Sequence, residues 1–131
     1  MNFNNIGFFI WRGERLLLLR RLGKSKEEMT LPVAAIGKIA GWRKKAKERL
    51  KKITGLEVAE DKIFSLPHVL ENARIRLCSV EEFSGKPRAK SKWEPAWIRI
   101  SDLSEYPIDP IVADAVKKVF GISAKSKYRL D

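Results

Sequence analysis

Two apolar runs joined by a short glycine-containing link near the N-terminus constrain the fold more than any other feature of the sequence. Residues 5–12 and 15–21 are each predicted to form a strand, with Arg12-Gly13-Glu14 as the turn between them. The chain is therefore expected to open on a β-hairpin. Its apolar stretches are far shorter than the ~20 residues that cross a bilayer, so we expect no transmembrane helix and no membrane partner.

A helical pattern follows the hairpin. The apolar residues of this segment are Trp42, Ala46, Leu50 and Ile53. Their spacing places them on one stripe of an α-helix, and the rest of the helix surface is cationic. Gly55 stands where a C-cap glycine is expected, so the helix should end near Thr54.

The remaining elements alternate between strands and loops before a second helix. Asp109 as N-cap and Pro110 at the first helical position predict where that helix begins, and Phe120 is its last residue. A short strand and turn are predicted at residues 33–37, strands at 63–70, 73–83 and 93–100, an exposed loop at 22–30 and a basic loop at 84–92. This order predicts an α+β domain with helices packed on a mixed or antiparallel sheet.

The size of the chain is that of a single domain. Its 131 residues suffice for a core without a metal or disulfide staple, so we expect one domain over residues 1–121 and a short polar tail over 122–131. The lone Cys78 cannot pair within the chain, and His68 is the only histidine, which argues against a zinc site. With no export signal at the N-terminus, we expect a cytoplasmic protein.

The charge balance points to a polyanionic partner. Lysine and arginine number 27 against 16 acidic residues, a formal net charge of +11. Such an excess attracts nucleotides, nucleic acid or an acidic membrane surface. A merely solvated basic surface is the alternative, and charge alone does not decide between them.

Several segments together resemble a Nudix hydrolase domain over nearly the whole chain. They are the hairpin with its Arg12-Gly13-Glu14-Arg15 turn, Leu31-Pro32, a helix that runs into Gly55-Leu56, and Trp93-Glu94-Pro95-Ala96-Trp97. The resemblance implies an α/β/α sandwich with a mixed central sheet and two main helices. It also implies Mg²⁺-dependent hydrolysis of nucleoside diphosphate derivatives, and adds a homodimer as an expectation.

The catalytic signature of that family is degenerate in this chain. Anchored on Gly55, the Nudix box runs from Ala34 to Leu56, and Leu50 matches a further structural position. Its chemical positions differ: Ala34 replaces glycine, Ala40 replaces the first glutamate, Glu48-Arg49 reverses Arg-Glu, and Lys52-Ile53 replaces Glu-Glu. A shift by one residue would align Glu48 but would place Lys51-Lys52 at the glutamate pair.

The resemblance assigns Mg²⁺ binding to those glutamates, and this chain has cations in their place. A hard divalent cation requires oxygen ligands and is repelled by Arg49 and Lys52. We therefore expect neither a metal site nor catalytic residues, and no cofactor. Lys45, Arg49 and Lys52 are spaced to share one helix face, where they could hold a phosphate directly. Lys92 and Trp93 could contribute a cation and a stacking ring.

The leading hypothesis is thus a Nudix-fold protein that binds a nucleotide or RNA without cleaving it. An ordinary solvated cationic helix face is the alternative for those lysines and arginines. A second hypothesis keeps the hydrolase, with Mg²⁺ held by Glu81, Glu82 or Glu94 in an unusual arrangement. A third makes the chain a scaffold for protein contacts. Of its tryptophans, Trp11 and Trp97 are expected to pack in the core.

Overall fold

The predicted N-terminal hairpin is confirmed. The computed structural model describes residues 5–21, 29–37, 41–70, 74–89 and 92–120, with the backbone alone at positions 68 and 69. Strand β1 (Asn5–Arg12) pairs antiparallel with β2 (Arg15–Arg21), with Trp11 opposite Leu16 and Arg12 opposite Arg15. Gly13 between them has a φ of 63°, a conformation that glycine adopts without steric cost.

The hairpin lies at the centre of a mixed six-stranded sheet. The other strands are β3 (Val33–Ala35), β4 (Phe64–Leu70), β5 (Ile75–Val80) and β6 (Trp93–Arg99). The order is β4-β5-β1-β2-β6, with β3 paired to β1 beside the start of that strand. The β1–β5 pairing is parallel and the others are antiparallel, so the expected mixed sheet is confirmed.

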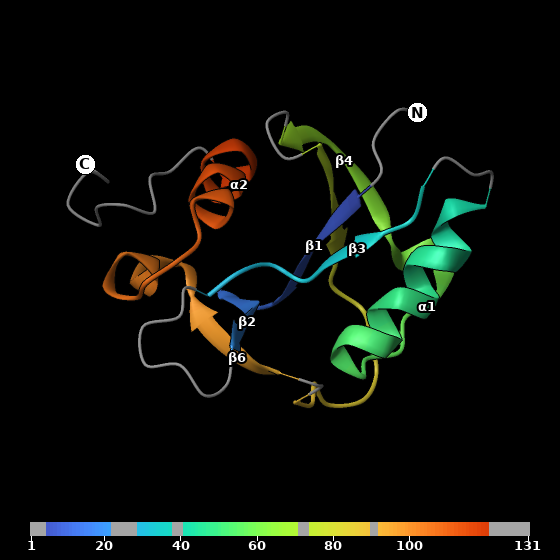
Figure 1. Ribbon diagram of the computed structural model, residues 1–131, viewed down its shortest axis with the longest axis horizontal. Coiled ribbons are helices and arrows are strands. Elements are labelled where there is room, and N and C mark those ends of the chain that lie inside the picture. The colour runs from blue at the N-terminus through green and yellow to red at the C-terminus, as the bar shows by residue number, and fades with distance from the viewer. Residues whose placement is uncertain (1–4, 22–28, 38–40, 71–73, 90–91, 121–131) are drawn as a thin grey trace.

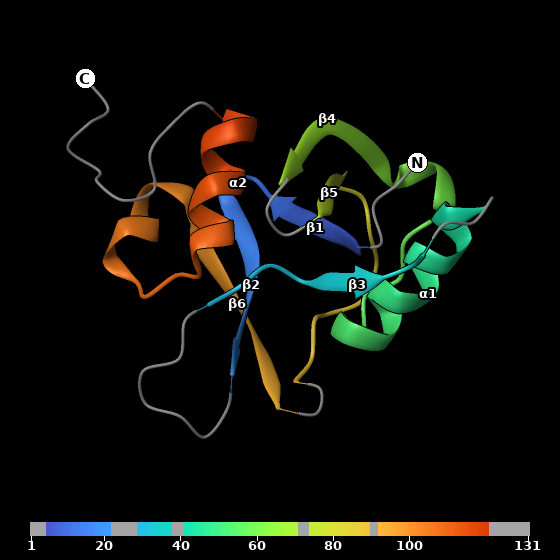
Figure 2. The same cartoon turned by 45° about the horizontal axis from the view of Figure 1, so that its top comes forward.

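Two helices cover opposite faces of this sheet (Figure 1). Helix α1 (Trp42–Thr54) buries Ala46 and Leu50 in one core cluster, and α2 (Pro110–Phe120) buries Val112, Ala115 and Val116 in another. Successive side chains of β1 point to opposite faces of the sheet and so contribute to both clusters, with Phe8 on the α1 side and Phe9 on the α2 side. The α/β/α arrangement expected from the resemblance is therefore present, as the second view also shows (Figure 2).

Helix α1 ends where the sequence predicts. Gly55 adopts a φ of 86° and its N–H donates to the carbonyl of Lys51 at 2.8 Å. The fully buried Thr54 donates its hydroxyl to the Leu50 carbonyl at 2.8 Å and accepts the Leu56 N–H at 3.1 Å. These bonds fix the last turn of α1 against the core.

The predicted exposed loop at residues 22–30 is wrong at its end. Met29 is buried, and Thr30 exchanges two backbone hydrogen bonds with Leu19, at 2.8 and 2.9 Å. The segment is therefore held against β2 by paired backbone groups. Residues 22–28, Ala40, the predicted tail at 122–131 and the side chain of His68 lie outside the described residues.

Three predicted strand boundaries also need correction. The first residue of β4 is Phe64, because Glu60–Lys62 form a 3₁₀ helix (η1) that uses the Ile63 N–H. Strand β5 spans only Ile75–Val80, since the exposed Glu81 and Glu82 have no partner strand in the described residues. The last strand ends at Arg99, where a second 3₁₀ helix (η3, Ile100–Glu105) begins. None of the helices formed by the described residues is long and apolar enough to cross a membrane.

Candidate functional site

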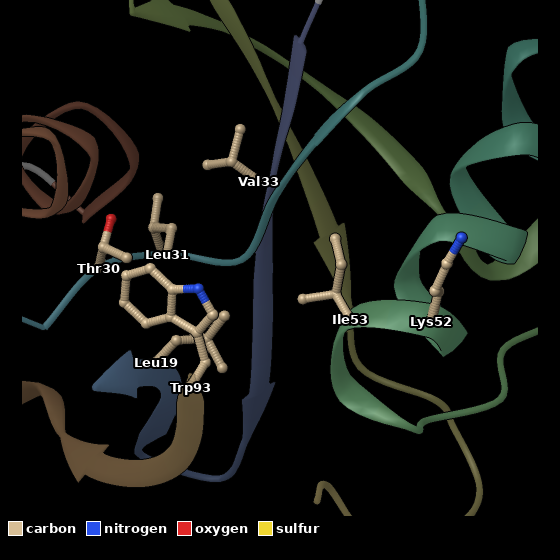
Figure 3. Close-up of a pocket in the computed structure, with 7 residues that line it drawn as sticks. All are labelled: Leu19, Thr30, Leu31, Val33, Lys52, Ile53 and Trp93. Atoms are coloured by element: carbon tan, nitrogen blue, oxygen red, sulfur yellow. The ribbon is translucent and has the colours of Figure 1, made fainter. Parts of the chain in front are cut away.

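A cavity of about 580 Å³ opens where the last turn of α1 faces β2 and the start of β6. Its lining residues are Leu19, Thr30, Leu31, Val33, Lys52, Ile53 and Trp93 (Figure 3). The lining is mostly apolar, and Lys52 is its one charged residue among the described part of the chain. This size and this composition are typical of sites for small organic ligands.

Backbone pairing holds one wall of the cavity. Leu19 belongs to β2 and exchanges backbone hydrogen bonds with Thr30. These bonds also hold the next residue, Leu31, close to β2. Trp93 begins β6 opposite Arg21 of β2. Figure 3 shows Trp93 with Leu19 and Leu31 on one side of the cavity and α1 on the other.

The last turn of α1 supplies the other wall. Ile53 is half-buried and Lys52 is exposed, and both residues line the cavity. The bonds of Thr54 to Leu50 and Leu56 set the position of this turn. The cavity therefore combines an apolar interior with a lysine on its α1 side.

The structure brings together two of the five predicted ligand-binding residues. Lys52 and Trp93 both line the cavity. Lys45 and Arg49 are half-buried on α1 and Lys92 is exposed, and none of the three is part of the lining. The cavity contacts only the last turn of α1. Lys45 and Arg49 lie on earlier turns of the helix and therefore do not reach it.

Sequence reasoning missed the apolar side of this site. Leu19, Leu31 and Val33 are apolar residues beside or within strands, and nothing in their local pattern separates a cavity wall from a core. The helical spacing places Ile53 on the core stripe of the helix, where it does pack in part. One signal was available: the alignment with the Nudix box places Lys52-Ile53 at the positions of its Glu-Glu pair, which could have marked Ile53 as part of the site.

The candidate acidic residues lie apart from one another. Glu94 of β6 forms an ion pair with Arg20 of β2, and its Oε1 accepts a hydrogen bond from the Arg20 Nε at 2.9 Å. Glu82 pairs with Lys62 at 3.2 Å, and Glu81 is exposed. In the described ranges, no three His, Cys, Asp or Glu side chains come close enough to hold a metal ion.

The residues of the cavity and the acidic residues near it do not fit the Mg²⁺ that the resemblance implies. Mg²⁺ binds oxygen ligands, usually one or two carboxylates with phosphate and water oxygens. The cavity instead presents Lys52 and hydrocarbon, and the nearest part of β6 holds its carboxylate, Glu94, in a pair with Arg20. The chemistry of the cavity is therefore that of its lysine and its apolar side chains.

Two of the tryptophans and the cysteine have packing roles. Trp11 and Trp97 are partly buried against the two core clusters, as predicted, and the Trp11 indole donates to the Ser79 hydroxyl at 3.2 Å. Cys78 is fully buried, and burial raises the pKa of its thiol from 9.0 to about 12. Its thiol therefore stays protonated and packs as a small apolar group.

The architecture matches solved structures of Nudix hydrolases. A MutT from work on the Aliivibrio salmonicida and Vibrio cholerae proteins superposes with a TM-score of 0.71 at 15% identity, covering 91% of this chain and 97% of that one. For a MutT Nudix hydrolase from Burkholderia pseudomallei the TM-score is 0.66 at 19% identity, with 88% and 95% covered. A Nudix hydrolase from Nitrosomonas europaea gives 0.65 at 11% identity, with 89% and 87% covered.

The sequence itself is far from these proteins. No family model matches the chain, and no curated protein matches it in sequence. At such identities the likeness establishes the fold, and it leaves the chemistry to be argued from the residues of this chain. The chain has the fold of the Nudix hydrolases.

Proposed function

We propose that this protein binds a phosphate-bearing ligand, a nucleotide or RNA, at the cavity and does not hydrolyse it. The observation that carries the proposal is the pairing of Lys52 with an apolar, tryptophan-lined cavity. Lys52 and Ile53 are also the residues that the box register aligns with a metal-binding glutamate pair. A cation at that place attracts phosphate and repels a divalent metal.

The two parts of a nucleotide match the two parts of the site. A nucleobase is flat and largely apolar on its faces, and it can stack on an aromatic ring such as Trp93. Leu19, Leu31 and Ile53 offer it hydrocarbon contacts. The phosphate would then lie toward Lys52, whose ammonium group can make charge-assisted hydrogen bonds to its oxygens.

The same residues argue against turnover. Diphosphate hydrolysis needs a group that activates water and positive charge that stabilises the transferred phosphoryl group. Lys52 offers charge but no base, and Glu94 is held by Arg20. Interactions that bind the ground state as well as the transition state give affinity without acceleration.

A matched pair of lysine variants tests the proposal. Lys52→Gln should weaken binding of ADP-ribose about tenfold, because it removes one charge-assisted hydrogen bond. Lys47→Gln is the control: it removes the same charge from an exposed position of α1 that does not line the cavity. Isothermal titration calorimetry of both variants measures the difference, and equal losses would reduce the effect to net charge.

The hydrolase hypothesis predicts a different result in the same preparation. Purified protein with ADP-ribose and Mg²⁺ or Mn²⁺ would then release AMP, and Glu81→Gln, Glu82→Gln or Glu94→Gln would abolish the release. We expect no AMP above the protein-free control. Turnover that one of these variants removes would contradict the proposal.

A further inference from the structure

Three arginines form a cross-strand ladder on the face of the sheet that α1 partly covers. The register places Arg12 of β1 opposite Arg15 of β2, and Arg15 opposite Arg99 of β6. Directly opposed residues in antiparallel strands project to the same face. All three side chains are exposed, and none forms an ion pair with an acidic residue in the described part of the chain.

This arginine ladder is not explained by stability. Like charges directly opposite each other in a sheet are destabilising, which selects against such pairs unless another role retains them. One pair of positions on the same two strands shows the usual solution, since Arg20 of β2 faces Glu94 of β6. The ladder therefore concentrates positive charge where pairing alone would favour mixed charges.

Arg12 is held in place by aromatic rings. Its guanidinium carbon lies 4.7 Å from the ring centre of Phe83 and 5.7 Å from that of Trp97. The two rings are themselves stacked, with their centres 6.0 Å apart. A guanidinium over a ring face is ordered while its N–H donors, which lie in its own plane, stay available to an anion.

A second cavity lies beside this arginine. It measures about 370 Å³ and is lined by Arg12, Gly85, Lys86, Pro87, Pro95 and Trp97. The loop that carries Lys86 is anchored to the end of α1: Ser84 and Glu57 exchange backbone hydrogen bonds at 2.8 and 3.0 Å, and the Arg88 N–H donates to the Thr54 carbonyl at 2.9 Å. Arg12 and Lys86 thus line the same small cavity, and backbone hydrogen bonds hold the loop that carries Lys86.

The two cavities lie along one strand. Trp93 lines the first cavity, while Pro95 and Trp97 line the second, and these alternate residues of β6 share a face. Trp93 and Trp97 are four residues apart, which is about 13 Å at the rise of a β-strand. The phosphates of one strand in a stacked helix rise about 3.4 Å per nucleotide along the helix axis, so this span corresponds to at most about four nucleotides.

We propose that the arginine ladder, with Lys86, binds the backbone phosphates of a single-stranded RNA whose terminal base occupies the first cavity. This inference rests on the proposed function and names its ligand class: an oligonucleotide rather than a mononucleotide. A single strand is required because a base stacked within a duplex could not enter the cavity. The aromatic rings beside the cations favour RNA over an anionic lipid surface.

The dependence of affinity on ligand length tests the proposal. Fluorescence anisotropy would compare oligouridylates of about four and about eight nucleotides, with uridine 5′-monophosphate measured as a competitor. We expect the oligonucleotides to bind at least about tenfold more tightly than the mononucleotide, with log affinity falling by about 0.7 per contacted phosphate per log unit of salt. Equal affinity for all lengths would overturn the inference.

A pair of double variants localises the contacts. Arg15→Gln/Arg99→Gln leaves the ring contacts of Arg12 intact and should reduce the magnitude of the salt slope by about 1.4, two phosphates at about 0.7 each. Arg74→Gln/Lys117→Gln removes the same charge from exposed positions before β5 and on α2 and should leave the slope unchanged. The same slope in both double variants would overturn the inference, as would binding to phosphatidylserine vesicles without binding to RNA.

The result for the mononucleotide separates the two proposals. If uridine 5′-monophosphate and ADP-ribose both fail to bind while the ladder still governs oligonucleotide binding, the proposed function and the terminal-base contact fail at the cavity, and the phosphate contacts of the ladder stand. If both bind and length has no effect, the cavity stands and the ladder fails. Thermal unfolding of the ladder variant should give an unchanged or higher Tm, which separates lost binding from lost fold.

Discussion

Two positions on strands β2 and β6 carry arginine in opposite arrangements. Arg20 is paired with Glu94, whereas Arg15 faces Arg99 on one side and Arg12 on the other. The paired arginine contributes to the sheet. The arginine ladder is expected to cost the sheet stability, so loss of an arginine should have opposite effects at the two positions.

The two helices also differ, in the charge of their surfaces and in the number of apolar side chains that they pack in the core. Helix α2 is largely apolar and buries Val112, Ala115 and Val116. Helix α1 has a mostly cationic surface and also buries three residues, Ala46, Leu50 and Thr54, but one of them is polar, and only Trp42 and Ile53 of this helix pack partly beside them. Helix α1 therefore packs fewer apolar side chains in the core than α2, and each of them should matter more to stability.

The largest expected effect comes from removing the main anchor of α1. Leu50→Ala should lower the free energy of unfolding by about 2–5 kcal/mol, since a fully buried leucine leaves a cavity. Val116→Ala on α2 deletes less volume from a helix with more apolar contacts and should cost less. Urea unfolding of both variants measures the difference, and a larger loss for Val116→Ala would reverse the comparison.

The next effect concerns the last turn of α1. Thr54→Val keeps the shape of the side chain but leaves the Leu56 N–H without its acceptor, which should cost about 1–3 kcal/mol. Because Ile53 and Lys52 belong to the same turn, binding of ADP-ribose should weaken as well. Stability and affinity unchanged in this variant would show that the hydroxyl does not position the site.

Cys78 makes the α1-side core sensitive to alkaline pH. The thiol pKa is about 12 in the folded protein and 9.0 in the reference state, so the unfolded chain loses the proton first. Stability from this group is complete below pH 9 and is lost as pH rises from 9 toward 12. Between about pH 8 and about pH 10 the stability of the wild type should fall by about 1.4 kcal/mol more than that of Cys78→Ala. An equal fall in both proteins would contradict this account.

The smallest effects compare the arginines directly. Arg20→Gln should reduce stability by at most about 1 kcal/mol, because it breaks a partly exposed ion pair. Arg15→Gln should leave stability unchanged or raise it by a few tenths of a kcal/mol, because it relieves repulsion with Arg12 and Arg99. Chemical denaturation resolves the two signs, and a loss of stability in Arg15→Gln would show that the ladder is structural.

Local patterns were sufficient to predict much of the fold. Gly13 marks the hairpin turn and Gly55 marks the end of α1, because each position requires a backbone conformation that few other residues adopt. The apolar stripe of α1 was correct because the helical period is visible within a single segment. The resemblance to Nudix hydrolases, drawn from several segments in order, added the α/β/α arrangement.

The site was less predictable because it depends on residues distant in the sequence. Lys52 and Trp93 could be predicted, but the cavity also needs Leu19 and Leu31, which meet them only through the pairing of β2 with β6 and with Thr30. The arginine ladder depends on the register between β2 and β6, which no local pattern specifies.

The most direct test of the central claim is the metal dependence of binding. The account predicts that ADP-ribose binds at least as tightly in EDTA as in excess Mg²⁺, because Lys52 contacts the phosphate without a bridging ion. Calorimetry in both buffers, with chromatography of the recovered ligand, should show retained affinity and intact ADP-ribose. Binding that requires Mg²⁺, accompanied by release of AMP, would contradict it.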